Sequence, residues 1–133
     1  MSTWSIGVIV ILFLLLAVVR LSAGDDVTAV GPEEAARRVA AGTAVLIDVR
    51  EATEWADGVA EPALLLSLSD LRGERETWKP VLAANREKEL ILYCRSGHRS
   101  GIAAKLLAKE GFHVANAGGF SAWRNAKLPE RKP

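Results

Sequence analysis

The segment Glu89–Cys94 (ELILYC), followed directly by residues 95–99 (RSGHR), decides the fold that we expect for this chain. An apolar run of this length predicts a β-strand that is buried on both faces, as in a parallel sheet covered by helices. Residues 100–110 have apolar side chains on one side and lysines on another, so they predict an amphipathic helix that ends at Gly111. A strand, a short loop and a helix are therefore expected to follow one another here.

The same alternation of strand and helix continues along the rest of the chain. A second apolar run at residues 44–49 (AVLIDV) predicts another central strand, and Pro32 marks the first turn of the helix before it. The other expected elements are strands at 27–29, 64–68 and 112–115, a mostly helical stretch at 69–86, and a short helix at 119–125. Strands that alternate with helices predict an α/β fold around a parallel sheet.

Two of the expected strands end in residues that are suited to chemistry. Ligands bind at the carboxyl ends of the strands in such a sheet, and these ends carry residues 48–50 (DVR) and 94–99 (CRSGHR). We interpret Asp48 and Arg50 as structural, because a carboxylate and a guanidinium at a strand end pair readily and brace neighbouring loops. Cys94 is the candidate for catalysis.

The loop after Cys94 has the composition of a loop that activates a thiol. Gly97 can adopt the positive φ of a tight curve, and such a loop turns backbone N–H groups inward at a helix N-terminus. Three basic residues lie nearby, namely Arg95, His98 and Arg99. Both features lower the pKa of reactive thiols, to about 3.5–7.5, and the thiolate is a nucleophile. A free cysteine is otherwise most often a small buried apolar residue, but a core position requires none of these neighbours.

Composition excludes several other kinds of protein. The chain has 133 residues, which suits one domain. Its 17 basic and 16 acidic side chains nearly balance, whereas non-specific nucleic-acid binding needs a clustered basic surface. We therefore predict no nucleic-acid partner. The single cysteine excludes an internal disulfide, a Cys-only zinc site and a CxxC redox pair, and we expect neither a metal nor another cofactor.

The first 24 residues (1–24) differ from the expected domain at 25–133. Residues 6–19 (IGVIVILFLLLAVV) are a continuous apolar run without a charged side chain. A secretory signal begins with a basic segment and ends in small residues, but here no basic residue precedes the run, and Leu21-Ser22-Ala23 begins with a bulky side chain. We therefore predict one uncleaved N-terminal transmembrane helix as a membrane anchor. A cleaved signal is the alternative.

Basic residues predict the orientation of this helix. None precedes it, whereas Arg20, Arg37 and Arg38 follow it within about 20 residues, and an excess of basic residues marks the cytoplasmic side. We therefore expect a single-pass membrane protein whose domain lies in the cytoplasm. A cleaved signal would instead make the domain periplasmic or exported.

Three stretches of the chain, in this order, resemble the signatures of the rhodanese family of single-domain sulfurtransferases. They are LIDVRE at 46–51 with Glu54-Trp55 and Gly58, the loop CRSGHR at 94–99, and NAGGFSAW at 116–123 followed by Leu128-Pro129. The resemblance covers nearly the whole expected domain, and it departs from the family at 58–63, where GVAEPA replaces the usual Gly-His-Ile-Pro-Gly-Ala. It implies a five-stranded parallel sheet flanked by helices, with a persulfide carried on the loop cysteine.

The resemblance also implies a two-step sulfur transfer. Cys94 would take the outer sulfur of a small anionic donor such as thiosulfate, and a thiol acceptor (a small molecule or a protein) or cyanide would then remove it. The substrate-binding cradle would consist of the loop residues Arg95, Ser96, Gly97, His98 and Arg99. Among these, Arg95 is the first candidate for donor binding, His98 is a weaker one, and Arg99 would fix the loop shape or add positive potential.

Two other classes of function are open. A membrane-anchored rhodanese-like module would dock a partner or carry persulfide with little turnover, although such modules often lose the cysteine that is present here. Related phosphatases have five residues between the cysteine and an arginine, and that arginine position holds Ser100 in this chain, whereas Arg99 comes one residue earlier. The shorter loop favours sulfur transfer over phosphatase chemistry.

Overall fold

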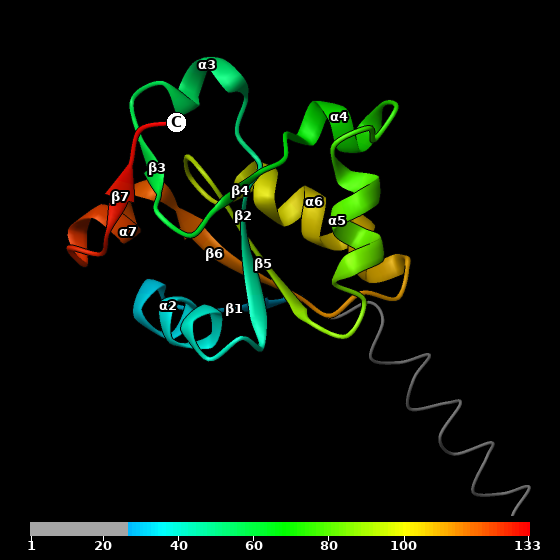
Figure 1. Cartoon of the computed structure of the whole chain (residues 1–133), viewed down its shortest axis with the longest axis horizontal. Helices are drawn as coiled ribbons and strands as arrows, with labels where there is room; N and C mark the ends of the chain where they lie inside the picture. The colour runs from blue at the N-terminus through cyan, green and yellow to red at the C-terminus, as the bar shows by residue number, and fades with distance from the viewer. Residues whose placement is uncertain (1–26) are drawn as a thin grey trace, which may run out of the picture.

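The computed structural model describes residues 27–133, so the expected transmembrane helix and the expected domain boundary at residue 24 lie outside the described residues. The described chain contains a five-stranded parallel sheet in the order β1-β6-β5-β2-β4 (Figure 1). Its strands are β1 (Thr28–Ala29), β2 (Ala44–Asp48), β4 (Leu64–Leu65), β5 (Glu89–Cys94) and β6 (Val114–Gly119). The expected α/β fold with a five-stranded parallel sheet is therefore confirmed. Between residues 27 and 133, no helix is both long and apolar enough to cross a membrane.

Helices cover both faces of the sheet (Figure 1). The helices α2 (Pro32–Ala40) and α7 (Phe120–Asn125) pack on one face, and α4 (Leu68–Arg72), α5 (Trp78–Ala84) and α6 (His98–Lys109) pack on the other. A one-turn helix, α3 (Ala52–Trp55), follows β2 after three residues.

The position of β5 in the middle of the sheet explains why residues 90–94 are all apolar. Leu90, Leu92 and Cys94 belong to the core cluster under α4, α5 and α6. The alternate residues Ile91 and Tyr93 belong to the cluster under α2 and α7. All five are at most 2 % exposed, so both faces of the strand contribute to burial, as the uninterrupted apolar pattern predicts.

The observed elements differ from the expected ones mainly at their ends. The helix expected at 100–110 begins earlier, at His98, because Gly97 has a φ of +94° and turns the chain directly into α6. The strand expected at 64–68 ends at Leu65, since Ser67 caps α4 by accepting a hydrogen bond from Asp70 N. The helical stretch expected at 69–86 is divided into α4 and α5.

A small antiparallel pair of strands has no counterpart among the expected elements. Its members, β3 (Val59–Ala60) and β7 (Glu130–Arg131), contain two residues each. The strand β3 directly follows Gly58, whose φ is +120°, in the segment that departs from the rhodanese signature. This pair links the carboxyl end of the chain to the segment after α3.

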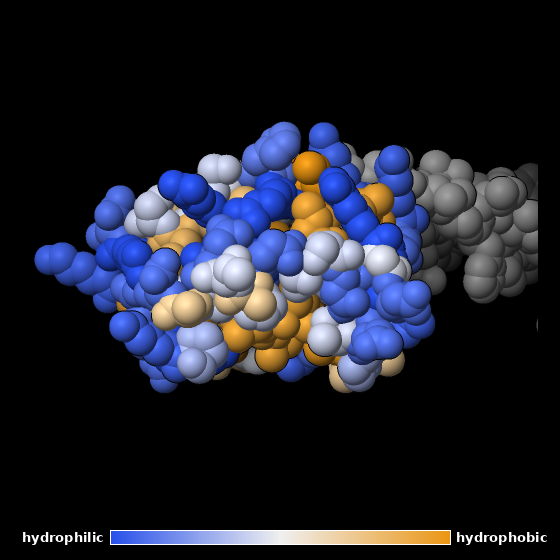
Figure 2. All heavy atoms as spheres, turned by 90° about the horizontal axis from the view of Figure 1, so that it is seen from above, coloured by the Kyte–Doolittle hydropathy of each residue, from blue (hydrophilic) through white to orange (hydrophobic). Residues whose placement is uncertain are grey.

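The carboxyl ends of the central strands meet at one edge of the sheet. Asp48 is level with Tyr93, and Cys94 is level with Gly119. Figure 2 views the molecule from above relative to Figure 1, which is the side that carries α3 and α4; hydrophilic side chains cover most of this surface around a smaller apolar area. The chemistry expected at two strand ends is therefore brought to a single, mostly polar edge.

Candidate active site

Cys94 is the last residue of β5, and its sulfur lies directly beneath the start of α6. The residue is 0 % exposed, and the backbone N–H of Gly97 donates a hydrogen bond to its Sγ over 3.0 Å. The positive φ of Gly97 turns this N–H inward, which only a glycine does without strain. The loop therefore directs the Gly97 N–H toward the sulfur.

A second group that contacts the sulfur was not among the predicted site residues. Ser100 lies in the first turn of α6 and is 0 % exposed, and its Oγ lies 3.4 Å from Cys94 Sγ. With the helix expected to begin at residue 100, sequence reasoning placed Ser100 outside the loop. The earlier start of α6 brings it into the site.

The pKa of the Cys94 thiol is lowered from its ordinary value, although burial alone raises it. The hydrogen bond from the Ser100 hydroxyl is the largest lowering contribution. The other lowering contributions come from backbone N–H groups, those of Ser100, Ser96 and Gly97. The direction agrees with the sequence prediction, but the main cause is the loop backbone and one hydroxyl rather than the three basic side chains.

The Arg99 side chain forms an ion pair with a residue outside the loop. Its Nη1 and Nη2 donate to the two carboxylate oxygens of Glu54 over 2.6 and 2.8 Å. Hydrogen bonds from Arg99 lower the pKa of Glu54 to about 2. Because this pair joins α6 to α3 and compensates the guanidinium charge, the geometry favours the loop-shaping role for Arg99 over a contribution to positive potential.

The side chains of the other predicted loop residues face outward. Arg95, Ser96 and His98 are exposed. An open cleft of about 540 Å³ lies beside the loop, and Arg95 lines it. The other charged side chains in its lining are Arg50, Glu54, Asp57 and Arg124. Within residues 27–133 Arg95 forms no ion pair, so its charge is available to an anion in the cleft.

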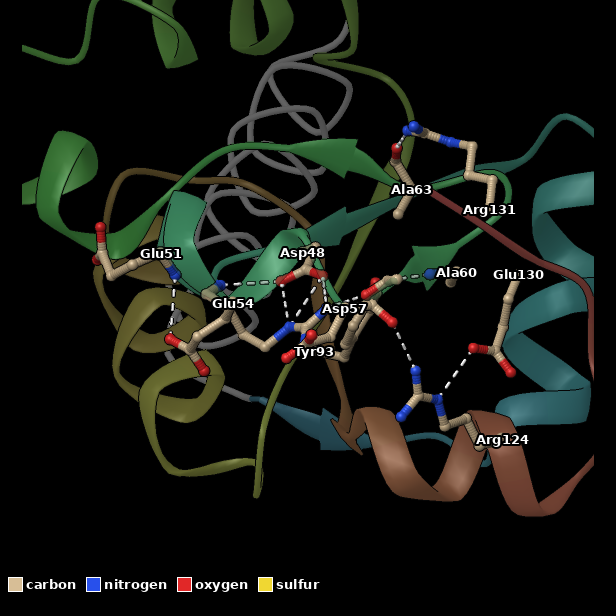
Figure 3. Close-up of polar contacts among 12 residues, drawn as sticks. Asp48, Glu51, Glu54, Asp57, Ala60, Ala63, Tyr93, Arg124, Glu130 and Arg131 are labelled. Atoms are coloured by element: carbon tan, nitrogen blue, oxygen red, sulfur yellow. Dashed lines mark hydrogen bonds and ion pairs between the residues drawn. The ribbon is translucent and has the colours of Figure 1, made fainter. Parts of the chain in front are cut away.

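At the neighbouring strand end, Asp48 and Arg50 form a buried ion pair, as the sequence predicts. Asp48 is 0 % exposed and accepts from Arg50 Nη2 at 2.7 Å, from Arg50 Nε at 3.1 Å and from Arg50 N at 2.9 Å. Arg50 Nη2 also donates to the carbonyl of Gly58. Figure 3 shows the Asp48 side chain with its hydrogen bonds drawn. The pair braces the segment after α3 against the sheet.

The same segment is also tied to α7. Arg124 pairs with Glu130 at 2.9 Å and donates to the carbonyl of Asp57 at 3.0 Å (Figure 3). Its guanidinium lies 4.4 Å from the centre of the Phe120 ring. Arg124 lines the cleft as well, so this part of its lining is held in place by paired charges.

Asn116 on β6 braces the cysteine loop from the neighbouring strand. Its Nδ2 donates to the Gly97 carbonyl over 2.9 Å, and its Oδ1 accepts from Ser100 Oγ at 2.8 Å and from Gly118 N at 3.0 Å. A Cβ on Gly119 would lie 2.4 Å from the Arg95 carbonyl, so only glycine permits this close approach of β6 and the loop. Asn116 lies within the carboxyl-terminal motif, but no pattern in the sequence marks it as a site residue.

This arrangement has a clear chemical capacity. A buried sulfur that accepts hydrogen bonds from a backbone N–H and a hydroxyl at a helix N-terminus holds a negative charge on the sulfur or on an atom attached to it. The adjoining cleft admits a small molecule, with the Arg95 cation at its side. The site is therefore suited to a nucleophilic thiolate that reacts with a small anion.

Comparisons with known proteins agree with this geometry. A family model described as "Rhodanese-like domain" matches residues 31–126. A Bacillus subtilis protein that is provisionally named a sulfurtransferase is 36% identical over 86 residues, which are 64% of this chain and 78% of the relative. A protein of Allochromatium vinosum named a sulfurtransferase is 32% identical over 89 residues, 64% of this chain and 76% of the relative. The structure of a human single-domain sulfurtransferase superposes with a TM-score of 0.63 at 25% identity, over 75% of this chain and 97% of the other.

Proposed function

Because the chain belongs to the rhodanese-like domain family, we propose that it is a sulfurtransferase that carries sulfur as a persulfide on Cys94. The observation that carries the proposal is the Cys94 sulfur itself, which accepts a hydrogen bond from Gly97 N at 3.0 Å beneath the N-terminus of α6. Two relatives named as sulfurtransferases match about two thirds of this chain in sequence, and the structure of another shares its fold.

In the first step, the Cys94 thiolate attacks the outer sulfur of an anionic donor such as thiosulfate. An electron pair of Sγ forms the new S–S bond, and the S–S bond of the donor breaks with its electron pair remaining on sulfite. The product on the enzyme is a Cys94 persulfide whose outer sulfur bears the negative charge. Backbone N–H groups that already point inward stabilise this charge without reorganisation.

In the second step, a thiolate acceptor or cyanide attacks the outer sulfur of the persulfide. The S–S bond breaks, its electron pair stays on Sγ, and the Cys94 thiolate is restored. Sulfur leaves as an acceptor persulfide or as thiocyanate. No metal or redox cofactor enters either step, because each is a nucleophilic displacement at sulfur.

Arg95 is the donor-binding residue in this mechanism. Its exposed guanidinium lines the cleft beside the loop, whereas the guanidinium of Arg99 is bound by Glu54. An anion that binds in the cleft beside the loop therefore meets Arg95, which forms no ion pair within residues 27–133. His98 is exposed at the start of α6 and is a weaker candidate for the same task.

The test of the nucleophile is Cys94→Ser. The matched control in the same loop is Ser96→Ala, because the Ser96 side chain is exposed and alanine keeps the backbone N–H. We expect sulfur transfer from thiosulfate to cyanide to be abolished in Cys94→Ser and retained in Ser96→Ala. Mass spectrometry after treatment with thiosulfate should show one added sulfur on the native chain, and it can lie only on Cys94 because the chain has a single cysteine. Transfer that persists in Cys94→Ser would refute the assignment.

A second candidate function is a module that carries persulfide or docks a partner with little turnover. The observation in its favour is that Cys94 is 0 % exposed, which limits access to the sulfur. Stable loading with sulfur, negligible turnover and a pull-down that is equally effective with Cys94→Ser would favour the module. An aryl-phosphate assay separates both functions from a phosphatase.

We also propose that residues 1–24 anchor the domain to a membrane, with the domain on the cytoplasmic side. Support comes from the apolar run at 6–19 and the basic residues after it. In the sheet, Thr28 pairs with Ala115 and β1 runs parallel to β6, so the chain enters β1 from the edge opposite to Cys94. A reporter fused after Pro133 that is active only outside the cytoplasm should be inactive, and an active reporter would contradict this orientation.

A further inference from the structure

We propose that Asn116 is a positioning residue for Cys94: its side-chain oxygen holds the proton of the Ser100 hydroxyl while the sulfur is neutral, and the hydroxyl turns to the sulfur when the sulfur becomes a thiolate. The consequence for turnover rests on the proposed sulfur transfer, but the proton switch itself does not. It is a property of three side chains that come from three different elements, β5, α6 and β6.

The orientation of the Asn116 amide is fixed by two backbone partners. Its Nδ2 donates to the Gly97 carbonyl at 2.9 Å, and its Oδ1 accepts from Gly118 N at 3.0 Å. A flipped amide would set N–H against N–H and carbonyl against carbonyl, and it would lose both bonds. The atom that faces Ser100 is therefore the oxygen, an acceptor.

The Ser100 hydroxyl has one proton and two acceptors within reach. Asn116 Oδ1 lies 2.8 Å from Ser100 Oγ, and Cys94 Sγ lies 3.4 Å from it. A hydroxyl donates one hydrogen bond at a time, and Ser100 is 0 % exposed, so bulk water does not compete. The two acceptors therefore compete for a single proton.

The charge on the sulfur decides this competition. A neutral thiol can donate its S–H to Ser100 Oγ while the hydroxyl donates to Asn116, which gives a chain of two hydrogen bonds that point away from the sulfur. After the thiol proton leaves to solvent, the anionic sulfur is the stronger acceptor, because hydrogen bonds to charged groups are about twice as strong as neutral ones. The switch needs only rotation about the Cβ–Oγ bond of Ser100, because both acceptors already lie within reach.

This arrangement bears on the second step of the proposed reaction. In the persulfide the charge lies on the outer sulfur, and the hydroxyl can remain on Asn116. When the acceptor takes the outer sulfur, the electron pair of the breaking S–S bond stays on Sγ, and the Ser100 hydroxyl turns to this leaving thiolate. Asn116 thus keeps the Ser100 hydroxyl beside the sulfur until negative charge develops on Sγ.

The test is the pH dependence of alkylation of the full chain by iodoacetamide, which reports Cys94 alone because the chain has one cysteine. Asn116→Ala is measured in the native background and in a Ser100→Ala background. Asn116→Ala also removes the hydrogen bond to the Gly97 carbonyl, but this loss affects both backgrounds equally. The difference between the midpoint shifts in the two backgrounds therefore isolates the effect that Asn116 exerts through the Ser100 hydroxyl. Asn116→Ala removes the acceptor that competes with the sulfur for the Ser100 proton. It should therefore lower the pH midpoint of alkylation by about 0.5–1 pH unit more in the native background than in the Ser100→Ala background.

Asn85→Ala is the matched control, because among residues 27–133 the Asn85 side-chain amide donates only to the Val81 carbonyl in α5. It should leave the midpoint unchanged. Equal shifts of Asn116→Ala in both backgrounds, no shift, or a difference of opposite sign would overturn the proposal and would leave Asn116 as a brace for the loop alone.

A second measurement does not depend on the folding of an Asn116 variant. The side-chain amide resonances of Asn116 in the native full chain should titrate with the midpoint of Cys94, because Oδ1 loses the Ser100 hydrogen bond as the thiol ionises. The change should be much smaller in Ser100→Ala, and equal titration in both chains would overturn the proposal. Neither measurement involves sulfur transfer, so inactivity with thiosulfate would count against the proposed function and not against this switch.

Discussion

The ends of β2 and β5 lie next to each other at the same edge of the sheet, yet they stabilise negative charge in different ways. At the end of β2, the Asp48 carboxylate is compensated by the Arg50 guanidinium and its backbone N–H. At the end of β5, the hydrogen bonds to the Cys94 sulfur come from Gly97 N and the Ser100 hydroxyl, both uncharged, among the residues that the structure describes.

The difference separates a structural site from a reactive one. The buried carboxylate and guanidinium at the end of β2 compensate each other, and removal of either partner leaves an uncompensated buried charge. A sulfur surrounded by dipoles can be a thiol, a thiolate or a persulfide, because the dipoles are fixed whether or not a charge is present. The following predictions test this contrast, from the largest expected effect to the smallest.

Replacement of the β2 carboxylate should cost the most stability. Asp48→Ala leaves the Arg50 guanidinium, whose side chain is only 7% exposed, without its partner. We expect a loss of about 3–5 kcal/mol in the free energy of unfolding, measured by urea denaturation. Glu34→Ala, which breaks exposed pairs with Arg37 and Arg38, is the control and should cost less than about 1 kcal/mol. Equal losses would remove the contrast between buried and exposed pairs.

A substitution in the loop after β5 should reduce stability less than Asp48→Ala does, and it should also reduce the reactivity of Cys94. Gly97 has a φ of +94°, and a Cβ there would lie 3.2 Å from Gly118 Cα. We expect Gly97→Ala to cost about 1–3 kcal/mol and to slow alkylation of Cys94 at neutral pH, because the N–H that faces the sulfur moves. Gly111→Ala, with a φ of +92° and no neighbour within 4 Å, is the control: it should share the strain but not the slower alkylation. Unchanged alkylation in Gly97→Ala would show that this N–H does not stabilise the thiolate.

The Glu54–Arg99 pair should give stability a specific dependence on pH. The pKa of Glu54 in the folded chain is lowered to about 2, below its value in the unfolded chain. Its contribution is therefore fully present above the ordinary carboxylate pKa and is lost as the pH falls through about 2. We expect Glu54→Gln to be less stable by about 1 kcal/mol at pH 7, because the pair is partly exposed.

Denaturation of Glu54→Gln and the native chain at several pH values checks this expectation. The difference between the two chains should shrink as the pH falls toward 2. A difference that stays constant with pH would show that the ion pair does not couple stability to protonation of Glu54.

The smallest effect on the fold is expected for Arg95, which forms no ion pair within residues 27–133. Arg95→Ala should leave the free energy of unfolding within about 0.5 kcal/mol of the native value and should raise KM for thiosulfate about tenfold with little change in kcat. Arg86→Ala, an exposed arginine that lines a separate pocket, is the control for the loss of one positive charge. A KM that is unchanged in Arg95→Ala would remove the donor-binding role.

Much of the architecture could be predicted because it follows from short-range patterns. The run Glu89–Cys94 is observed as β5 with the expected bounds, and the helix that opens at Pro32 is α2. The pairing of Asp48 with Arg50 joins residues only two positions apart. In each case the interacting groups, or the periodicity that buries them, lie within one local segment.

The sequence by itself therefore determined the parallel α/β sheet and the end of β5 where Cys94 lies. Only the tertiary structure decided what surrounds the sulfur: it bound Arg99 to Glu54, 45 positions away, and joined Ser100 to Asn116, 16 positions away. It also formed the two-residue strands β3 and β7, which are too short for a pattern. The physical reason is that apolar periodicity records which face of an element is buried, whereas a hydrogen bond between elements depends on register and on the first residue of a helix, which local sequence does not encode.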